Sequence, residues 1–385
     1  MIFGLHKSWV VMVSLGASPL PPSWKTGGNS WRARTPSSRQ QRGCDGNGCH
    51  TATGDRRRGK HRAMVSMCRL MKDYRNAISD YGGGDGDFTV DNKEVLHAVV
   101  TGANRGLGFA IADEMVSLGH RTVLACRDKN EGDAALERIR SHWPRQLAEL
   151  ASVHQLDVAS ADSIRTFQKN CVEGQLGGRV DILFNNAAVC FEGRDSAVVD
   201  HTLAVNVFGA VDVMKACLPA MCGHEATVVW VSSGDGELCF LGSKWQGILR
   251  EASTVEEVIS YLTDLQDVAK TEKWQHQQEE IAFGPTPIYS LSKAAANAVV
   301  RTLAPSLQDS SGGGVRLVAV CPGDVLTRMF SMTEATTAAF GTGADEEHSR
   351  PLLPEEAARV VTDVALRSFD FPCGRFYRNG KEIGW

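Results

Sequence analysis

The feature that most constrains this chain is a glycine-rich turn that joins an apolar run to an amphipathic segment. Residues 95–100 are apolar and rich in valine, which predicts a buried strand. Gly102, Gly106 and Gly108 follow, and glycine allows both a tight turn and the close approach of a ligand to the backbone. Apolar residues then recur at helical spacing, at Leu107, Ile111, Met115 and Leu118. Because the first N–H groups of a helix lack partners, the turn fits either a nucleotide diphosphate site or a plain helix-initiating loop.

Beyond the turn, apolar strand patterns alternate with helical patterns, which predicts a parallel sheet with right-handed crossovers. The predicted strands are residues 95–100, 121–126, 153–156, 180–184, 226–231 and 315–320, with an edge strand at 374–377. The predicted helices after the turn are residues 131–142, 199–221 and 289–307, with one more beginning at Ser160. The predicted fold class is therefore α/β, a doubly wound, Rossmann-like parallel sheet. Ligands of such sheets bind at the carboxyl ends of the strands.

Residues 1–92 differ from the rest, because they are basic, poor in acids, and show no helix or strand period. Such a segment buries too little apolar surface to fold. One interpretation is a targeting peptide, which would place the protein in an organelle. The other is an unstructured extension, or translated upstream sequence with the true start at Met64 or Met67, which fits a cytoplasmic protein. We therefore predict a disordered or targeting extension over 1–92 and one folded domain over 93–385.

Composition excludes several classes of partner. The 385 residues carry a net charge of -4, which argues against nucleic acid. Eleven cysteines are scattered without a C-x-x-C pair, which is typical of free thiols or a reducing compartment. Cys44, Cys49 and His50 lie close together in a glycine-rich segment without a second ligand pair, so we expect no metal site. No apolar run appears long enough for a membrane span.

A helical insertion is predicted over residues 234–288. Thr254 and Glu257 have the spacing of a capping box that starts a helix. Apolar residues follow on one helix face, at Val255, Val258, Ile259, Leu262 and Leu265. Such a helix must cover an apolar surface.

Tyr289 and Lys293 lie four residues apart and therefore on one face of a predicted helix. A nearby ammonium stabilises a phenolate, so we expect Lys293 to lower the pKa of Tyr289 toward the working pH. Such a phenol is suited to act as a general acid in carbonyl reduction. An isolated pair of this kind more often lies on a solvated helix face, so the motif carries weight only beside others.

Other motifs accompany the pair, and together they resemble the short-chain dehydrogenase/reductase family over residues 96–385. In the order of the family they are Thr101-Gly102-x3-Gly106-x-Gly108, Asp157, Asn185-Asn186-Ala187, Asn206-Val207-Phe208-Gly209, Ser233, Tyr289-x3-Lys293 and Pro322-Gly323 with Thr327. The chain departs from the family pattern at Ala188, where the family usually has glycine. The insertion and residues 374–385 are similar to the monomeric carbonyl reductases of the family and their plant relatives, which implies a monomer.

The resemblance implies four catalytic residues. Tyr289 would protonate the substrate oxygen, and Lys293 would lower the pKa of Tyr289 and hold the nicotinamide ribose. Ser233, the later serine of the Ser232-Ser233 pair, would hydrogen-bond the carbonyl. Asn206 would hold a water that relays protons to Lys293.

The resemblance also implies a set of cofactor-binding residues, namely Thr101, Gly102, Asn104, Arg105, Gly106, Leu107, Gly108, Arg127, Asp157, Val158, Asn186, Ala187, Tyr289, Lys293, Pro322, Gly323, Val325 and Thr327. An acid at the end of the second strand suits the ribose hydroxyls of NAD, whereas an arginine there suits the phosphate of NADP. Arg127 ends that strand and Arg105 lies in the glycine turn, so two guanidinium groups could bracket a phosphate. We therefore predict NADP(H), with Asp128 as counter-evidence one step beyond the ribose.

These features predict an NADP-dependent oxidoreductase that acts on C=O or CH–OH groups. The leading hypothesis is NADPH-dependent reduction of a small-molecule ketone, aldehyde or quinone, with Tyr289 as proton donor. The alternatives are alcohol oxidation with NADP and a catalytically silent nucleotide-binding regulator. The complete set of Asn206, Ser233, Tyr289 and Lys293 argues against the regulator. The sequence does not indicate which substrate is used. The insertion and the segment after Pro322 would build the substrate pocket, and neither carries a motif that specifies a substrate.

Overall fold

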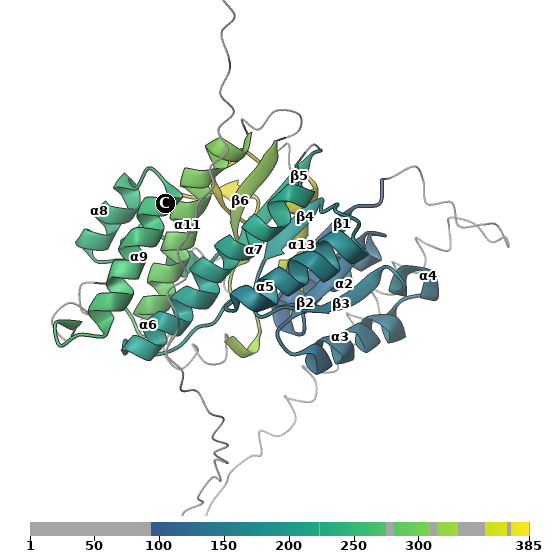
Figure 1. The fold of residues 1–385 in the computed structure, drawn as a ribbon, viewed down its shortest axis with the longest axis horizontal. Coiled ribbons are helices and arrows are strands. Elements are labelled where there is room, and N and C mark those ends of the chain that lie inside the picture. The colour runs from purple at the N-terminus through teal and green to yellow at the C-terminus, as the bar shows by residue number, and fades with distance from the viewer. Residues whose placement is uncertain are drawn as a thin grey trace, which may run out of the picture. The chain divides into compact units, whose positions relative to one another are not determined.

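The computed structural model describes residues 94–222, 224–274, 281–308, 314–329, 351–367 and 371–384. Within them one sheet has the strand order β3-β2-β1-β4-β5-β6-β7-β8 (Figure 1). The strands are β1 His97–Thr101, β2 Arg121–Cys126, β3 Ala151–Gln155, β4 Ile182–Asn185, β5 Ala226–Val231, β6 Val315–Cys321, β7 Phe376–Arg378 and β8 Lys381–Glu382. Neighbouring strands run parallel except for the last pair, β7 and β8. The predicted doubly wound α/β fold is confirmed.

Several predictions lie outside the described residues. They concern the extension over 1–92, with its Cys44, Cys49 and His50, and both candidate starts, Met64 and Met67. The structure says nothing of them.

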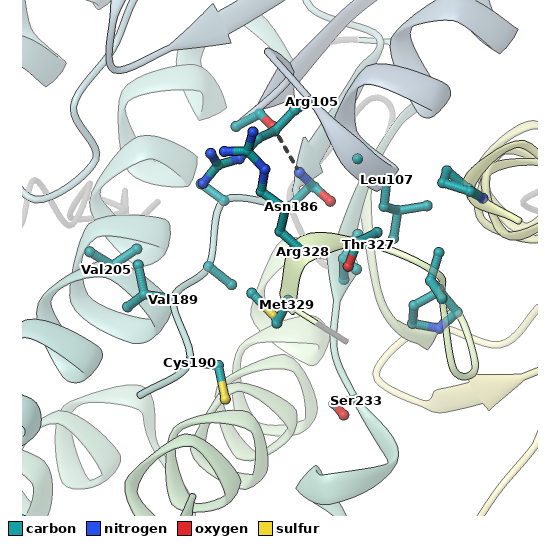
Figure 2. Close-up of a pocket in the computed structure, with 18 of the residues that line it drawn as sticks. Arg105, Leu107, Asn186, Val189, Cys190, Val205, Ser233, Thr327, Arg328 and Met329 are labelled. Carbon is teal, nitrogen blue, oxygen red and sulfur yellow. Dashed lines mark hydrogen bonds between the residues drawn. The ribbon is translucent and has the colours of Figure 1, made fainter. Parts of the chain in front are cut away.

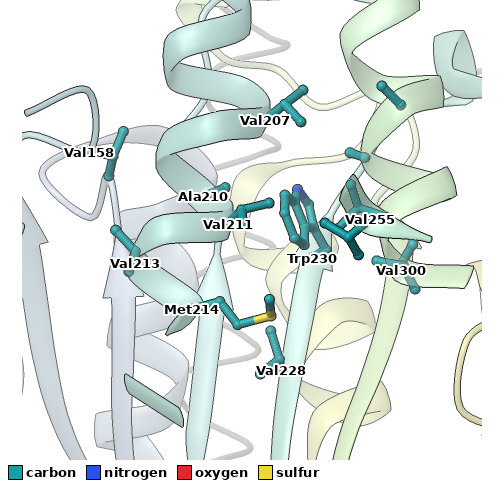
Figure 3. Close-up of a cluster of buried hydrophobic side chains, with 14 of the residues drawn as sticks. Val158, Val207, Ala210, Val211, Val213, Met214, Val228, Trp230, Val255 and Val300 are labelled. Atoms are coloured by element: carbon teal, nitrogen blue, oxygen red, sulfur yellow. The ribbon is translucent and has the colours of Figure 1, made fainter. Parts of the chain in front are cut away.

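Helices cover both faces of the sheet, because each strand alternates its apolar side chains between two core clusters. The helices are α2 Gly106–Ser117, α3 Lys129–His142, α4 Arg145–Ala148, α5 Ala161–Phe167, α6 Ser196–Leu203, α7 Ala210–Cys217, α8 Ser243–Glu251, α9 Val255–Ala269, α11 Pro287–Gln308 and α13 Pro354–Leu366. Val100 of β1 packs in the cluster that includes α2, α3 and α13, whereas Val99 packs in the cluster that includes α5, α7 and α11. In this second cluster, Trp230 of β5 lies between Val211 of α7 and Val300 of α11 (Figure 3).

The predicted helix over 199–221 is broken in the structure. A π-helical turn, η2 Ala204–Gly209, joins α6 to α7, and a 3-10 turn, η3 Leu218–Ala220, ends the segment. The whole stretch Ser196–Ala220 is long and apolar enough to cross a membrane, contrary to our expectation from the sequence. Most of it is buried within the domain, however, as expected of a core helix.

In the described part of the segment between Ser233 and Tyr289, the α-helices α8 and α9 both pack on α11. Of the five apolar residues that the sequence placed on one face of α9, all are buried except Ile259, which is half-buried, and α9 contacts α11 and α6 (Figure 1). Thr254 caps α9 by accepting a hydrogen bond from the Glu257 N–H, while the Glu257 carboxylate accepts from Ser253. Arg301 of α11 donates to the backbone oxygens of Leu249 and Ala252, so it satisfies the last carbonyls of α8. The predicted helix therefore covers α11, the helix that carries Tyr289.

Candidate functional site

A cavity of about 790 Å³ opens at the carboxyl ends of the parallel strands. The turn after β1, the segments after β4 and β5, the start of α11 and the segment after β6 line it. Every predicted cofactor-binding residue lines this cavity except Thr101 and Gly108. The strand order reverses between β1 and β4, which is where ligands of doubly wound sheets bind.

The glycine turn needs its glycines for two different reasons. Gly102 and Gly106 have φ values of 67° and 56°, in the left-handed region that other residues avoid. Gly108 is needed for space, because a Cβ there would lie 2.4 Å from both the Gly102 oxygen and Asn186 Nδ2. Gly108 thus lets α2 pack against the turn. We had predicted Gly108 as a cofactor-binding residue, but it does not line the cavity.

Thr101 is likewise a structural residue beneath the cavity. Its hydroxyl donates to the Phe184 oxygen at 3.2 Å and accepts from the N–H groups of Asn186 and Ala187 at 3.0 Å. Asn186 Nδ2 donates in return to the Thr101 oxygen at 2.8 Å. This network ties the end of β4 to the end of β1 and fixes the cavity floor.

Charged side chains gather at the end of the cavity near the glycine turn. Arg105 and Arg127 are exposed and line this end, and Arg105 lies far from Ser233 in the view of the cavity (Figure 2). Asp128 is the N-cap of α3 and accepts from the N–H groups of Asn130 and Glu131. Because its carboxylate accepts these capping hydrogen bonds, Asp128 argues only weakly against a phosphate beside Arg127.

At the other end of the cavity, Ser233 and Tyr289 both line the wall. Ser233 immediately follows β5, and Tyr289 lies in the first turn of α11. The neighbouring Ser232 points its hydroxyl to Asn297 Oδ1 at 2.7 Å, inside the protein. This geometry agrees with the choice of Ser233 rather than Ser232 as the serine that faces a ligand.

Lys293 lies beside Tyr289, but its effect differs from our expectation. Its Nζ lies 5.5 Å from the centre of the Tyr289 ring and donates to the Val231 oxygen at 2.9 Å. Burial raises the pKa of Tyr289 well above its usual value, and Asp235 adds to the rise. The predicted lowering by Lys293 is wrong for this structure, because the ammonium lies beside the ring and the phenol is fully desolvated. Burial also lowers the pKa of Lys293, to about 8.

Asn206 lies in the π-helical turn η2 and does not line the cavity. Its side chain accepts from the Val189 N–H at 2.8 Å and donates to the Val189 oxygen and to Ser292 Oγ at 2.9 Å. These bonds show that the Asn206 side chain positions Val189, which does line the cavity. The role of Asn206 in holding a water stays a prediction.

Sequence reasoning missed several residues of the cavity. Val189 and Cys190 follow the Asn185-Asn186 motif, and Asp235 follows Ser233 by two residues. Their positions just beyond strand ends were a usable signal. Asp324 and Met329 come from the segment after β6, where no local pattern marks them.

The end near the glycine turn fits a dinucleotide. The positive-φ glycines leave space that a Cβ would fill, and α2 begins at Arg105 without a side-chain cap. The first N–H groups of α2 are therefore available to a phosphate, with two arginines beside them. The cavity volume falls in the usual range of cofactor sites.

Comparisons with known proteins agree with this site. A family description, short chain dehydrogenase, matches residues 96–243. Carbonyl reductase (NADPH) 1 of Mus musculus is 30% identical over 302 residues, which cover 75% of this chain and 98% of the relative. The (+)-neomenthol dehydrogenase of Arabidopsis thaliana is 30% identical over 264 residues, covering 60% and 84% respectively. The solved structure of salutaridine reductase from Papaver somniferum superimposes with a TM-score of 0.58 at 26% identity, covering 73% of this chain and 99% of that one.

The fold and the glycine-turn site define a dinucleotide-binding oxidoreductase. The chain belongs to the short-chain dehydrogenase/reductase family, as its motifs predicted.

Proposed function

We propose that this chain catalyses the NADPH-dependent reduction of a carbonyl compound to the alcohol, with Tyr289 as proton donor. The observation that carries the proposal is that Ser233, Tyr289 and Lys293 line one end of the cavity that begins at the glycine turn, with Lys293 Nζ 5.5 Å from the centre of the Tyr289 ring. The cofactor is NADP(H), in agreement with the name of the mouse relative and with Arg105 and Arg127 at the phosphate end.

In this proposal the chain orients the substrate and delivers a proton. Ser233 Oγ and the Tyr289 hydroxyl would both donate a hydrogen bond to the substrate oxygen, since both residues line this end of the cavity. Tyr289 gives its proton to that oxygen, and the positive charge of Lys293 offsets the phenolate that forms. Bound reduced nicotinamide supplies the hydride that converts the carbonyl carbon to CH–OH. High pKa values favour the protonated phenol as the resting form, which a proton donor requires.

The test replaces Tyr289 with phenylalanine, which keeps the ring and removes the hydroxyl. General acid catalysis contributes about 10²–10⁴-fold, so kcat for a ketone or quinone should fall by at least this range. NADPH binding, followed by its fluorescence, should persist. Tyr261→Phe is the matched control, because Tyr261 is an exposed residue of α9.

Two outcomes would favour other functions. Turnover confined to alcohols with NADP would make the chain an alcohol dehydrogenase that uses the same residues in reverse. Tight NADPH binding without turnover in either direction, in the parent and both variants, would support a nucleotide-binding regulator. Assays with a diketone, a quinone and a panel of alcohols separate the three.

We also propose that the protein is a monomer. The face of α11 is covered by α8 and α9 of the same chain, through the buried Val258 and Leu262 among others. Other members of the family are expected to pair through that face. Sedimentation at micromolar concentration should give the mass of one chain, and a stable dimer would contradict the proposal.

A further inference from the structure

Asp235 stands beside the reacting atoms but has no part in the mechanism above. It lies in a 3-10 turn, η4 Gly234–Gly236, and lines the cavity. Its N–H donates to Ser233 Oγ at 3.2 Å. Because Ser233 Oγ is one of the atoms proposed to hold the substrate oxygen, Asp235 lies next to the proposed position of that oxygen.

The position of Asp235 is fixed by the catalytic helix. Asn297 of α11 donates to the Gly236 oxygen at 3.2 Å and accepts from Ser232. A Cβ on Gly236 would lie 2.9 Å from the carbonyl carbon of Lys293, so the turn packs directly on α11. A carboxylate held this way is preorganised toward whatever occupies the cavity.

Nearby cations do not neutralise Asp235. Lys293 donates to a backbone oxygen, and Arg378 pairs with Glu237 at 2.6 Å. No ion pair in the described part of the chain includes Asp235. Burial and the nearby Asp324 raise the pKa of Asp235, against smaller opposite effects of Lys293 and Arg378. A carboxylate in such a place is stabilised by a cation.

The remaining surface at this end is largely apolar. Cys190 and Met329 line it on the side of Ser233, and Val189 and Val205 line it farther from Ser233 (Figure 2). A ligand complementary to this end of the cavity is therefore a largely apolar molecule that carries one positive charge near its carbonyl group, opposite Asp235.

We propose that the preferred substrates are carbonyl compounds that carry a protonated amine, and that Asp235 binds the amine. This inference rests on the proposed carbonyl reduction and specifies its substrate class. A charge-assisted hydrogen bond to the carboxylate favours the cationic ketone over a neutral ketone of equal shape by about tenfold to a hundredfold.

The test compares three ring ketones of similar size at pH near neutrality. They are 1-methylpiperidin-4-one, which is mostly cationic, 4-methylcyclohexanone, which is neutral, and 4-oxocyclohexane-1-carboxylate, which is anionic. In the parent protein kcat/KM should decrease in that order, with the cationic ketone at least about tenfold above the neutral one. In Asp235→Asn the ratio of cationic to neutral should fall to about one. Asp128→Asn removes the same charge at the other end of the cavity and should keep the parent ratio.

A binding measurement needs neither turnover nor a variant. Calorimetric titration of the parent protein, saturated with NADP, should give tighter binding of 1-methylpiperidin-4-ol than of 4-methylcyclohexanol. Equal affinities, or an unchanged ratio of the two ketones in Asp235→Asn, would overturn the inference. Preferential binding of the amine without reduction of any ketone would overturn the proposed function and keep the role of Asp235 in cation recognition.

Discussion

The two ends of the cavity are built in different ways. The cofactor end is made mostly of backbone, namely the glycine turn and the uncapped start of α2, held by Thr101 and Asn186. The substrate end is made of side chains from three distant segments, such as Cys190, Asp235 and Met329. Backbone sites admit few sequences, whereas a wall of side chains can change residue by residue. The first end therefore defines the family, and the second defines the individual protein.

The strongest test of this contrast is Gly108→Ala. The added methyl would meet the Gly102 oxygen at 2.4 Å and displace the turn. A displacement of this kind should lower kcat/KM about 100-fold, and the overpacking should lower the free energy of unfolding by about 1–3 kcal/mol. Gly247→Ala is the control, since nothing lies within 4 Å of its Cβ position in α8. Steady-state kinetics and thermal unfolding should separate the two variants, and equal behaviour would mean that the turn tolerates side chains.

A smaller effect is expected where the cofactor end does use side chains. Arg127→Asp removes a charge-assisted contact to the 2′-phosphate of NADPH, worth about 1.5–3 kcal/mol, so NADPH affinity should fall about tenfold or more. NADH affinity should change little. Arg121→Asp makes the same change at the exposed opposite end of β2 and serves as control. Equal losses for both cofactors would assign Arg127 a structural role.

The smallest effect is expected in the pH dependence of kcat/KM, which should follow the charge of Lys293 at the substrate end. Burial lowers its pKa to about 8, so the ammonium is present below this pH and lost above it. If the charge supports proton transfer from Tyr289, kcat/KM for carbonyl reduction should fall as pH rises and reach about half its plateau near pH 8. A profile that stays flat through pH 9 would show that the charge of Lys293 is not needed.

Much of the fold could be predicted, because strands and amphipathic helices leave local patterns. The strand over 121–126 and the strand over 226–231 have the bounds that the sequence indicated. Helix α13 was missed although Pro354 and two glutamates give it a recognisable start. The π-helical break at Gly209 had no local signal. A Cβ there would lie 2.1 Å from the Val158 oxygen, so the break is linked to a close contact with a distant segment.

The candidate site, too, could be predicted only in part. The motifs predicted that Ser233, Tyr289 and Lys293 belong to one site, and the three residues do line one cavity. The direction of the pKa shift of Tyr289 was predicted wrongly, because burial cannot be deduced from the spacing of residues. The hydrogen-bond partners of the Asn206 side chain, Val189 and Ser292, are remote in the sequence and could not be predicted from it. The position of Asp235 just beyond a strand end could have marked it as a cavity residue. Its function could not be predicted, because it depends on which charged groups surround Asp235 in the folded protein.

Because α8 and α9 cover α11 within one chain, the stability of this region should not depend on protein concentration. A helix face that is buried by a partner subunit is exposed again when the complex dissociates, so stability then follows mass action. Here the covering residues, Val258 and Leu262 among them, belong to the same chain and stay at a fixed effective concentration. For a chain that functions alone, specific activity and melting temperature would then be the same at nanomolar and micromolar protein.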